Sequence, residues 1–391
     1  MTSYEAIVLG VGGVGSAALY HLAHRGVRVL GLDRFPPGHD RGSSHGATRI
    51  IRQAYFEHPD YVPLVLRAYR LWDELSEHAG ETLREEAGLL EIGPPQGEVV
   101  AGVLASASAH GLEVEQLTAE QIHRRWPGFQ VPEGLTGVYE RRAGFLRAER
   151  CVAAHAAQAV QSGAELLSDR QVLGWQADGS GVAVQTDRET LRANYLVICA
   201  GAWATQMLAG VGIRFEVRRK PVFWFETFND AYRSDRSPAF LYELPTGIFY
   251  GTPQIDGAGV KVAEHTGGDE VADPLNINRE ITAADLAPVE RFVRQCLSHA
   301  AARVTQHSVC MYTMSPDAQF VVDWHPAHPQ VIFVAGLSGH GFKFAPVLGE
   351  IVADLVKSGV TNYPIGFLRS TRFGTETRGQ IAEASDEVSE P

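Results

Sequence analysis

A glycine-rich turn between two apolar segments, within residues 4–33, constrains this chain more than any other feature. The first apolar segment covers residues 6–9, a helical pattern covers 16–23, and the second apolar segment, 27–32, ends at Asp33. This order predicts a βαβ unit that binds a dinucleotide, because the turn can approach a pyrophosphate and Asp33 can accept a hydrogen bond from a ribose hydroxyl. A tight turn without a nucleotide is the less favoured alternative, and the pattern leaves FAD and NAD open. The turn contributes Gly10, Gly12, Val14 and Gly15.

The composition is that of an ordinary globular protein. With 391 residues, 45% of them hydrophobic and 20% charged, the chain is long enough for two domains with a large core. Its net charge of -12 and its lack of a basic cluster argue against a nucleic-acid or anionic-membrane partner. We find neither an apolar run long enough to cross a membrane nor a cleaved signal, and therefore expect a cytoplasmic protein. The widely spaced cysteines predict reduced thiols rather than disulfides or a metal site; they are Cys151, Cys199, Cys296 and Cys310.

The long loop after Asp33 is predicted to be functional. Residues 34–48 are rich in proline, glycine, serine and histidine, and long loops in compact domains usually carry function. If Thr48 starts a turn of helix, Arg49 and Arg52 lie on one face. A solvated basic turn is the alternative interpretation.

Later segments predict a second, mainly antiparallel sheet. Residues 216–228 alternate and are rich in aromatic side chains, and further strands are expected over 247–251 and 260–265. Period-two spacing places Lys261 and His265 on the same face, which is costly to bury unless the two are paired or functional. Only four of the 34 basic residues are lysine and the rest are arginine; the lysines are Lys220, Lys261, Lys343 and Lys357.

Two further apolar strands are predicted to return to the first sheet. Residues 194–200 break at Gly201, which allows a ligand to approach the backbone closely, and residues 331–334 precede a second glycine turn and a helix to about residue 355. We also expect a hairpin at Asp178-Gly179, helices over 146–161 and 278–299, and a strand over 309–322.

The overall prediction is an α/β fold with a Rossmann-like nucleotide-binding domain and a second domain built on the antiparallel sheet. The nucleotide-binding domain is assigned residues 1–85, 145–215 and 311–373, and the substrate domain residues 86–144 and 216–310. The polar, acidic end of the chain, residues 374–391, is expected to be disordered.

Several motifs in this order resemble one family. With the βαβ unit come SSHGATRIIR (43–52), TGIFYG (246–251), VKVAEH (260–265), VCMYTMSPD (309–317) and GLSGHGFKF (336–344). Together they resemble the family of monomeric sarcosine oxidase and N-methyltryptophan oxidase, within the D-amino-acid-oxidase-like flavoproteins. The resemblance covers residues 4–373 and implies FAD rather than NAD.

The resemblance implies roles for individual residues. Cys310 matches the cysteine bonded covalently to the flavin, although a buried inert thiol is the alternative that the residue alone favours. Arg52 and Lys343 match the cations that hold the substrate carboxylate, and Lys261 matches the lysine placed where oxygen is reduced. The other implied residues are Tyr250, His265, Tyr312 and Leu241 in the substrate pocket, His45 and Arg49 beside the flavin ring, and Arg34, Ser43, Gly201, Gly339 and Gly341 at the cofactor.

The implied reaction is oxidation of the N-methyl group of a secondary amino acid, with formaldehyde and hydrogen peroxide as products. Sarcosine is the first expected substrate and N-methyltryptophan the second, and a monomer is expected. An NAD-linked dehydrogenase and a flavin-binding protein without turnover are the alternatives from other classes. The chain departs from the family pattern near the expected site at Ser44, Ala47, Leu241 and Thr252.

Overall fold

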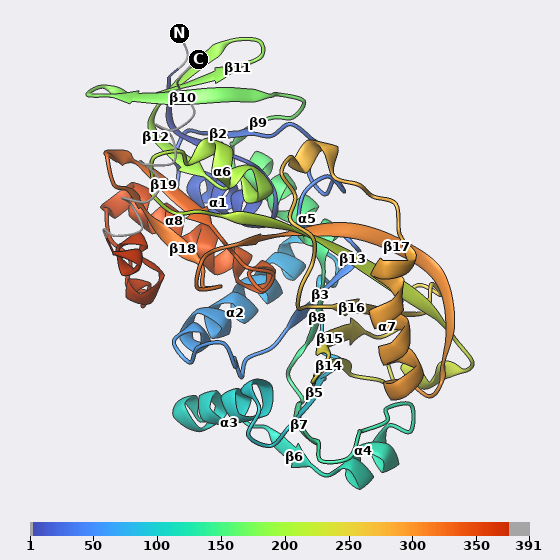
Figure 1. Ribbon diagram of the computed structural model, residues 1–391. Coiled ribbons are helices and arrows are strands. Elements are labelled where there is room, and N and C mark those ends of the chain that lie inside the picture. Colours follow the sequence, from blue (N-terminus) through green and yellow to red (C-terminus); the bar gives the residue numbers. More distant parts are fainter. Residues whose placement is uncertain (1–2, 375–391) are drawn as a thin grey trace.

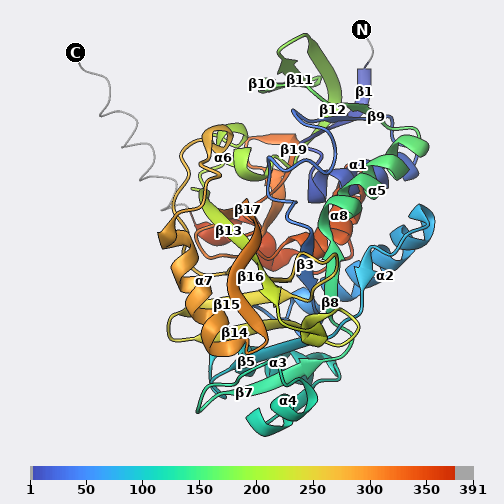
Figure 2. The same ribbon diagram turned by 90° about the vertical axis from the view of Figure 1, so that its right-hand side faces the viewer.

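A computed structural model describes residues 3–374 of the chain. Of the segment predicted to be a disordered tail, 374–391, all but Gly374 lies outside the described residues. The described part contains two eight-stranded sheets and one small three-stranded sheet (Figure 1). Strands β13 (Glu216–Thr227) and β17 (Ala300–Met314) pair with each other over their length. They lie between the first sheet with its helices and the rest of the second sheet (Figure 2).

The first sheet is built around β1 (Ser3–Leu9), as the apolar pattern predicts. Strand β1 pairs in parallel with β2 (Val29–Leu32) on one side and with β12 (Thr190–Ile198) on the other. Its other strands are β9 (Glu165–Leu167), β10 (Val172–Asp178), β11 (Gly181–Thr186), β18 (Val321–His325) and β19 (His328–Ala335). The predicted hairpin is confirmed, because β10 and β11 pair from Asp178 and Gly181 outward.

Helices cover one face of this sheet and share an apolar core with it. Helix α1 (Gly13–His24) packs against α5 (Ala148–Gln161) and α8 (Ala345–Ser358), and α2 (Tyr61–Ala79) packs against α5 and α8. The short α6 (Ala204–Met207) belongs to the apolar cluster on the opposite face. The α1 N-terminus thus follows β1 directly, which is the arrangement that the fingerprint predicts.

The second sheet has the order β17-β13-β16-β15-β14-β5-β7-β6. It is largely antiparallel, and α7 (Ala283–Cys296) packs on its apolar face beside β13, β14, β15 and β16, as Figure 1 shows. The remaining strands and the peripheral helices are β5 (Leu89–Gly93), β6 (Glu115–Leu117), β7 (Thr136–Glu140), β14 (Ala239–Leu244), β15 (Gly247–Thr252), β16 (Val260–Glu264), α3 (Glu98–His110) and α4 (Ala119–Arg125).

Two predicted elements have different limits. The helix expected over 278–299 is shorter, because Thr282 caps it: the Thr282 hydroxyl accepts from Asp285 N at 3.2 Å, and the Asp285 carboxylate accepts from Thr282 N. The strand expected over 309–322 is two strands, β17 and β18, because a turn after Met314 separates them.

The expected turn of helix at Thr48 is wrong. Residues Thr48–Ile51 form strand β3, which pairs antiparallel with β8 (Gly144–Arg147) in the small sheet completed by β4 (Arg84–Glu85). The β-branched side chains of this segment favour a strand once a partner is present. Strand β8 also takes the first two residues that were predicted to be part of α5.

Short 3₁₀ segments complete the described chain, at Gly201–Trp203, Asp230–Tyr232, Pro274–Asn276, Phe342–Phe344, Gly366–Leu368 and Ser370–Phe373.

Candidate functional site

A cavity of about 280 Å³ begins at the carboxyl end of β1. The turn of the fingerprint forms one wall, and Gly10 adopts a φ of +86°. Gly15 does not line the cavity. A Cβ atom added to it would lie 1.7 Å from the carbonyl oxygen of Gly10, so this glycine allows α1 to pack tightly on the turn. The predicted cofactor residues that do line the cavity are Gly10, Gly12, Val14, Asp33, Arg34, Ser43, Arg49, Gly201, Gly339 and Gly341.

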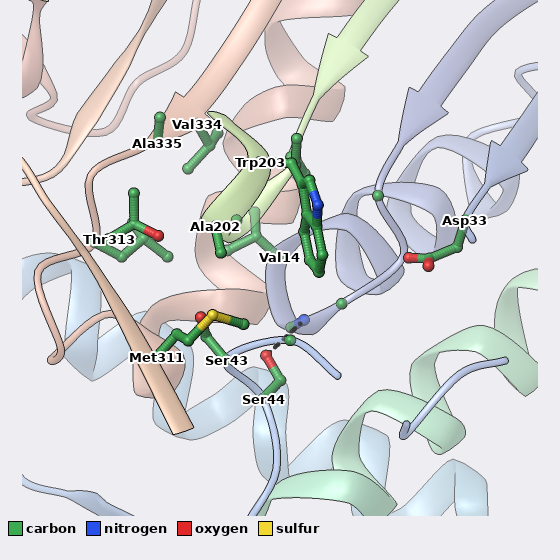
Figure 3. A pocket seen from close by; sticks show the side chains of 18 of the residues that line it. Val14, Asp33, Ser43, Ser44, Ala202, Trp203, Met311, Thr313, Val334 and Ala335 are labelled. Carbon is green, nitrogen blue, oxygen red and sulfur yellow. Dashed lines mark hydrogen bonds between the residues drawn. The ribbon is translucent and has the colours of Figure 1, made fainter. Parts of the chain in front are cut away.

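Asp33 holds the turn as well as facing the cavity. Its Oδ2 accepts from Val11 N at 2.6 Å and its Oδ1 accepts from Phe35 N at 2.9 Å. Figure 3 shows Asp33 at one end of the cavity, Met311 at the other and Trp203 between them. An acid beside the glycine turn is what a dinucleotide site needs, because it can accept a hydrogen bond from a ribose hydroxyl.

The two departures in the long loop have structural compensations. Ser44 Oγ accepts from Gly13 N at 3.1 Å, the bond drawn in Figure 3, so Ser44 ties the loop to the start of α1. Ala47 has a φ of +66°, a region that a side chain rarely adopts. It is held there because Glu149 Oε1 accepts from both Gly46 N, at 2.6 Å, and Ala47 N, at 3.0 Å. A carboxylate from α5 thus supports this loop.

A second, smaller cavity of about 70 Å³ adjoins the first. Four residues line both cavities: Arg49, Tyr312, Gly339 and Phe342. The smaller cavity brings together eight of the predicted site residues, which are Arg49, Arg52, Leu241, Tyr250, His265, Tyr312, Gly339 and Lys343. These come from β3, the loop after it, β14, β15, the residue after β16, β17, the glycine turn after β19 and the Phe342–Phe344 turn.

The two cations predicted to hold a carboxylate are both buried at this cavity. Arg52 donates from Nη2 to Glu57 Oε2 at 2.5 Å and from Nε to Glu91 Oε1 at 3.2 Å. Lys343 Nζ donates to the carbonyl oxygen of His340 at 2.7 Å. Burial, then the charge of Arg52, lowers the pKa of Lys343 to about 7.

Neutral polar groups line the opposite wall. The hydroxyl groups of Tyr250 and Tyr312 lie 3.4 Å apart, and His265 Nδ1 lies 3.4 Å from the Tyr312 hydroxyl. Burial lowers the pKa of His265 to about 3, so this imidazole is uncharged at neutral pH. The wall can therefore hydrogen-bond a ligand without adding charge.

Cys310 lies behind the shared wall, beside Arg49. Its Sγ is 3.5 Å from Arg49 Nη2 and 3.4 Å from the carbonyl oxygen of His45. Burial alone raises the pKa of a thiol, but the charges of Arg49, His45 and Lys261 outweigh it and lower the pKa of Cys310 to about 6. The other three cysteines are free and buried, as the sequence predicts.

Lys261 is buried and paired with backbone oxygens rather than with a carboxylate. Its Nζ donates to the carbonyl oxygens of Gly46, at 2.6 Å, and Thr48, at 2.9 Å. Burial and then Arg49 lower the pKa of Lys261 to about 7. Besides Gly15, three predicted residues line neither of these two cavities: His45, Lys261 and Cys310. His45 belongs to the long loop, Lys261 binds that loop, and Cys310 contacts Arg49.

Sequence reasoning missed several residues of the site. Glu57 and Phe56 follow Arg52 closely and line the smaller cavity, as does His340 within the glycine turn. Glu91 and Glu149 reach the site from β5 and α5, and only the distances between elements show this. Trp203 lines the larger cavity two positions after Gly201, and a bulky residue so near a predicted ligand contact was the available signal.

The larger cavity has polar atoms that fit a dinucleotide. Ser43 Oγ and Thr313 Oγ1 are buried, line this cavity and have no hydrogen-bond partner among the described residues. Such atoms are costly to leave unpaired, so their presence beside the glycine turn favours a polar ligand there. Within residues 3–374, no cluster of three or more histidine, cysteine or acidic side chains could hold a metal ion, and no helix is long and apolar enough to cross a membrane.

Comparisons with known proteins agree with this geometry. Residues 5–355 match the family described as FAD dependent oxidoreductase. The chain is 42% identical to monomeric sarcosine oxidase from Streptomyces avermitilis, over 95% of this chain and 98% of that protein, and 36% identical to N-methyl-L-tryptophan oxidase from Salmonella dublin, over 95% and 99%. Among solved structures, the open form of NikD, an unusual amino acid oxidase essential for nikkomycin biosynthesis, is similar with a TM-score of 0.82 and 26% identity over 94% of this chain and 98% of that chain.

These matches confirm the predicted fold class and cofactor and remove NAD as the alternative. A nucleotide cavity built on the β1 turn, a small polar cavity beside it and matches along nearly the whole chain lead to one conclusion: the chain belongs to the family of FAD-dependent oxidoreductases.

Proposed function

We propose that this protein oxidises N-methyl amino acids with dioxygen, and that sarcosine is its first substrate. The observation that carries the proposal is the lining of the smaller cavity. Arg52 and Lys343 both line it, and it shares a wall with the nucleotide cavity. Two cations suit a carboxylate, and binding it there would direct the amine end of the substrate toward the shared wall. The names of the relatives support the same class of substrate.

The size of the smaller cavity favours sarcosine over N-methyltryptophan. About 70 Å³ suits a molecule of few heavy atoms, and Phe56 and Leu241 are part of the wall. N-methyltryptophan is the second candidate because relatives of that name are 36% identical to the chain.

FAD, when bound, supplies the electron acceptor for the substrate and passes the electrons to dioxygen. The residues proposed to hold it are the turn residues Gly10, Gly12, Val14 and Gly15, with Asp33, Arg34, Ser43, Arg49, Gly201, Gly339 and Gly341. We propose that Cys310 would hold FAD through a thioether, with its thiolate as the nucleophile; the carbon–hydrogen bond replaced by the carbon–sulfur bond would release its proton to solvent, and dioxygen would take the two electrons. The low pKa of Cys310 supports this role.

The chain's own residues would prepare the substrate in three ways. Arg52 and Lys343 bind its carboxylate, and His265, Tyr250 and Tyr312 orient the rest without adding charge. Nearby positive charge from Arg49 lowers the pKa of the bound amine, and the neutral amine is the form that can be oxidised. We propose that Lys261, fixed by two carbonyl oxygens, stabilises the negative charge that develops when dioxygen is reduced, and that His45 adds to the positive field.

An anaerobic titration followed by the visible flavin absorbance tests the proposal. Bleaching by sarcosine and not by N-methyltryptophan would support the first substrate, and the reverse result would move the protein to the second. A yellow protein that neither compound bleaches would refute this substrate class. A buffer blank and glycine, the expected product, serve as controls.

We also propose that the chain works in the cytoplasm as a monomer. Its four free, buried cysteines suit a reducing compartment, and the first relative above is named as monomeric. We propose the domain division given from the sequence, with the first sheet in the FAD-binding domain and the second in the substrate domain.

A further inference from the structure

Glu91 is a buried carboxyl group next to the proposed substrate site, and nothing in the proposed reaction uses it. It lies on β5, is 0% exposed and accepts a single hydrogen bond, from Arg52 Nε at 3.2 Å. Its Oε2 has no partner among the described residues. A buried acidic side chain with one oxygen unpaired is rare in a stable core and points to a role.

The register of the second sheet places Glu91 under the smaller cavity. Glu91 on β5 pairs with Leu241 on β14, and register partners on neighbouring strands point to the same face. Leu241 lines the cavity, whereas Glu91 does not. Glu91 therefore reaches the ligand only through Arg52.

The charges around Arg52 do not leave room for another anion. The groups that face Glu91 are Arg52, Glu57 from the loop after β3, Glu140 from β7 and Lys343 from the Phe342–Phe344 turn. If all are ionised, three carboxylates face two cations. A substrate carboxylate would add a further negative charge to a buried site, which is unfavourable unless one acidic group is neutralised.

Glu91 is the acidic group most easily neutralised. Glu140 accepts from the backbone nitrogens of Gln53 and Ala54, between 2.8 and 3.0 Å, and Glu57 has the short bond to Arg52. These hydrogen bonds stabilise the charged forms of Glu140 and Glu57, whereas Glu91 accepts only the longer bond from Arg52 Nε. Burial raises the pKa of Glu91 to about 8, while Arg52, Lys343 and His340 counter burial and lower the pKa of Glu57.

We propose that Glu91 is a positioning residue that couples capture of a substrate carboxylate by Arg52 to uptake of a proton from solvent. Neutral Glu91 still accepts from Nε and keeps the guanidinium in place between the rings of Tyr55 and Phe56. The charge of Arg52 is then opposed by Glu57 and the ligand and no longer by Glu91. This inference rests on the proposed carboxylate site of Arg52 and Lys343.

The sign of the pH dependence follows from this coupling. Below about pH 8 Glu91 is already protonated and the ligand binds without taking up a proton there. As pH rises further, Glu91 must regain a proton on binding, so affinity falls by up to about tenfold per pH unit from this group. Lys343 adds a separate contribution, which a variant at position 91 leaves in place.

The test is calorimetric binding of methoxyacetate to the holoenzyme at pH 9, in buffers of different ionisation enthalpy. Methoxyacetate has the shape of sarcosine, but an ether oxygen replaces the amine nitrogen. It therefore has no amine to be oxidised and can bind without turnover. The number of protons taken up is expected to be smaller by roughly half a proton or more in Glu91→Gln than in the wild type. The KM for sarcosine at pH 9 should fall in the same variant with little change in kcat.

Controls make each outcome decisive. Glu243→Gln changes a carboxylate on β14 that binds the start of α3 instead of Arg52, and it should keep the wild-type proton uptake. Glu91→Leu, which is also uncharged, should show the same reduced proton uptake as Glu91→Gln but bind methoxyacetate more weakly, because leucine cannot accept from Arg52 Nε; its proton uptake can be measured if Glu91→Gln fails to fold. If the wild type and both Glu91 variants take up the same number of protons, the proposed role of Glu91 is overturned while the carboxylate site stands. Failure of methoxyacetate to bind the wild type at any pH overturns the carboxylate site and this inference with it.

Discussion

The sulfur of Cys310 lies 3.5 Å from the Nη2 atom of Arg49, although the two residues are 261 positions apart. Arg49 lines both cavities, and Cys310 stands behind it on β17. The arginine is partly buried, so water screens its charge on the thiol less than at the surface. A thiol whose pKa is lowered to about 6 thus lies next to the junction of the two cavities.

Cys310→Ser is expected to keep the flavin bound but to release it when the protein is denatured by acid. The wild type should retain yellow colour in the acid precipitate, because the thioether survives denaturation. Cys199→Ser is the matched control: Cys199 lines the larger cavity itself, but burial raises the pKa of its thiol to about 12, which disfavours the nucleophilic thiolate. Release of flavin from the wild type would show that the linkage is absent.

Lys261→Met is expected to slow reoxidation of the reduced flavin by dioxygen by roughly 10²-fold or more, since a fixed cation facing developing negative charge is lost. Reduction by sarcosine should change little. Stopped-flow measurement of the two half-reactions separates these effects. Lys220→Met is the control, because Lys220 is also buried and bound to backbone oxygens, those of Thr266 and Gly267. Unchanged reoxidation in Lys261→Met would remove the assigned role.

Glu149→Ala is expected to lower the free energy of unfolding by about 2 kcal/mol, because Gly46 N and Ala47 N lose their charged acceptor. The positive φ of Ala47 would then lack its restraint. Urea unfolding of the holoenzyme measures the loss. Glu149→Gln keeps a neutral acceptor oxygen and should recover part of it. If Glu149→Ala is as stable as the wild type, the carboxylate does not hold this loop.

The parts of the site that could be predicted from sequence are those encoded locally. The turn from Gly10 to Gly15, the strand before it and the acid after it are consecutive, and the structure has them as expected. Likewise, the period of β16 placed Lys261 correctly inside the second sheet.

The remaining parts depend on partners far away in the chain. Strand β3 forms because β8, about a hundred residues later, pairs with it, and the isolated segment at Thr48 suggested a helix instead. The same holds for polar partners: Glu91 reaches Arg52 across 39 positions, and Glu149 reaches Gly46 across 103. A surface glutamate and a buried one look alike in the sequence, so only the packing of β5 and α5 identifies these two.

Protonation of buried histidines is expected to destabilise the protein in mild acid, and His21 on α1 offers a specific test. His21 is 7% exposed, and burial lowers its pKa from 6.5 to about 4. Between these two values the unfolded chain binds a proton that the folded chain does not, so stability falls as pH decreases. From pH 7 to pH 5 this group alone should remove about 2 kcal/mol from the free energy of unfolding.

His21→Leu should therefore reduce the loss of stability between pH 7 and pH 5 by about that amount, whatever its effect at pH 7. Urea unfolding at the two pH values measures the difference. His78→Leu, a change at an exposed histidine at the end of α2, should leave the pH dependence of the wild type in place. An identical pH dependence in His21→Leu and the wild type would mean that His21 takes up its proton without unfolding, through an opening of the packing between α1 and its neighbours.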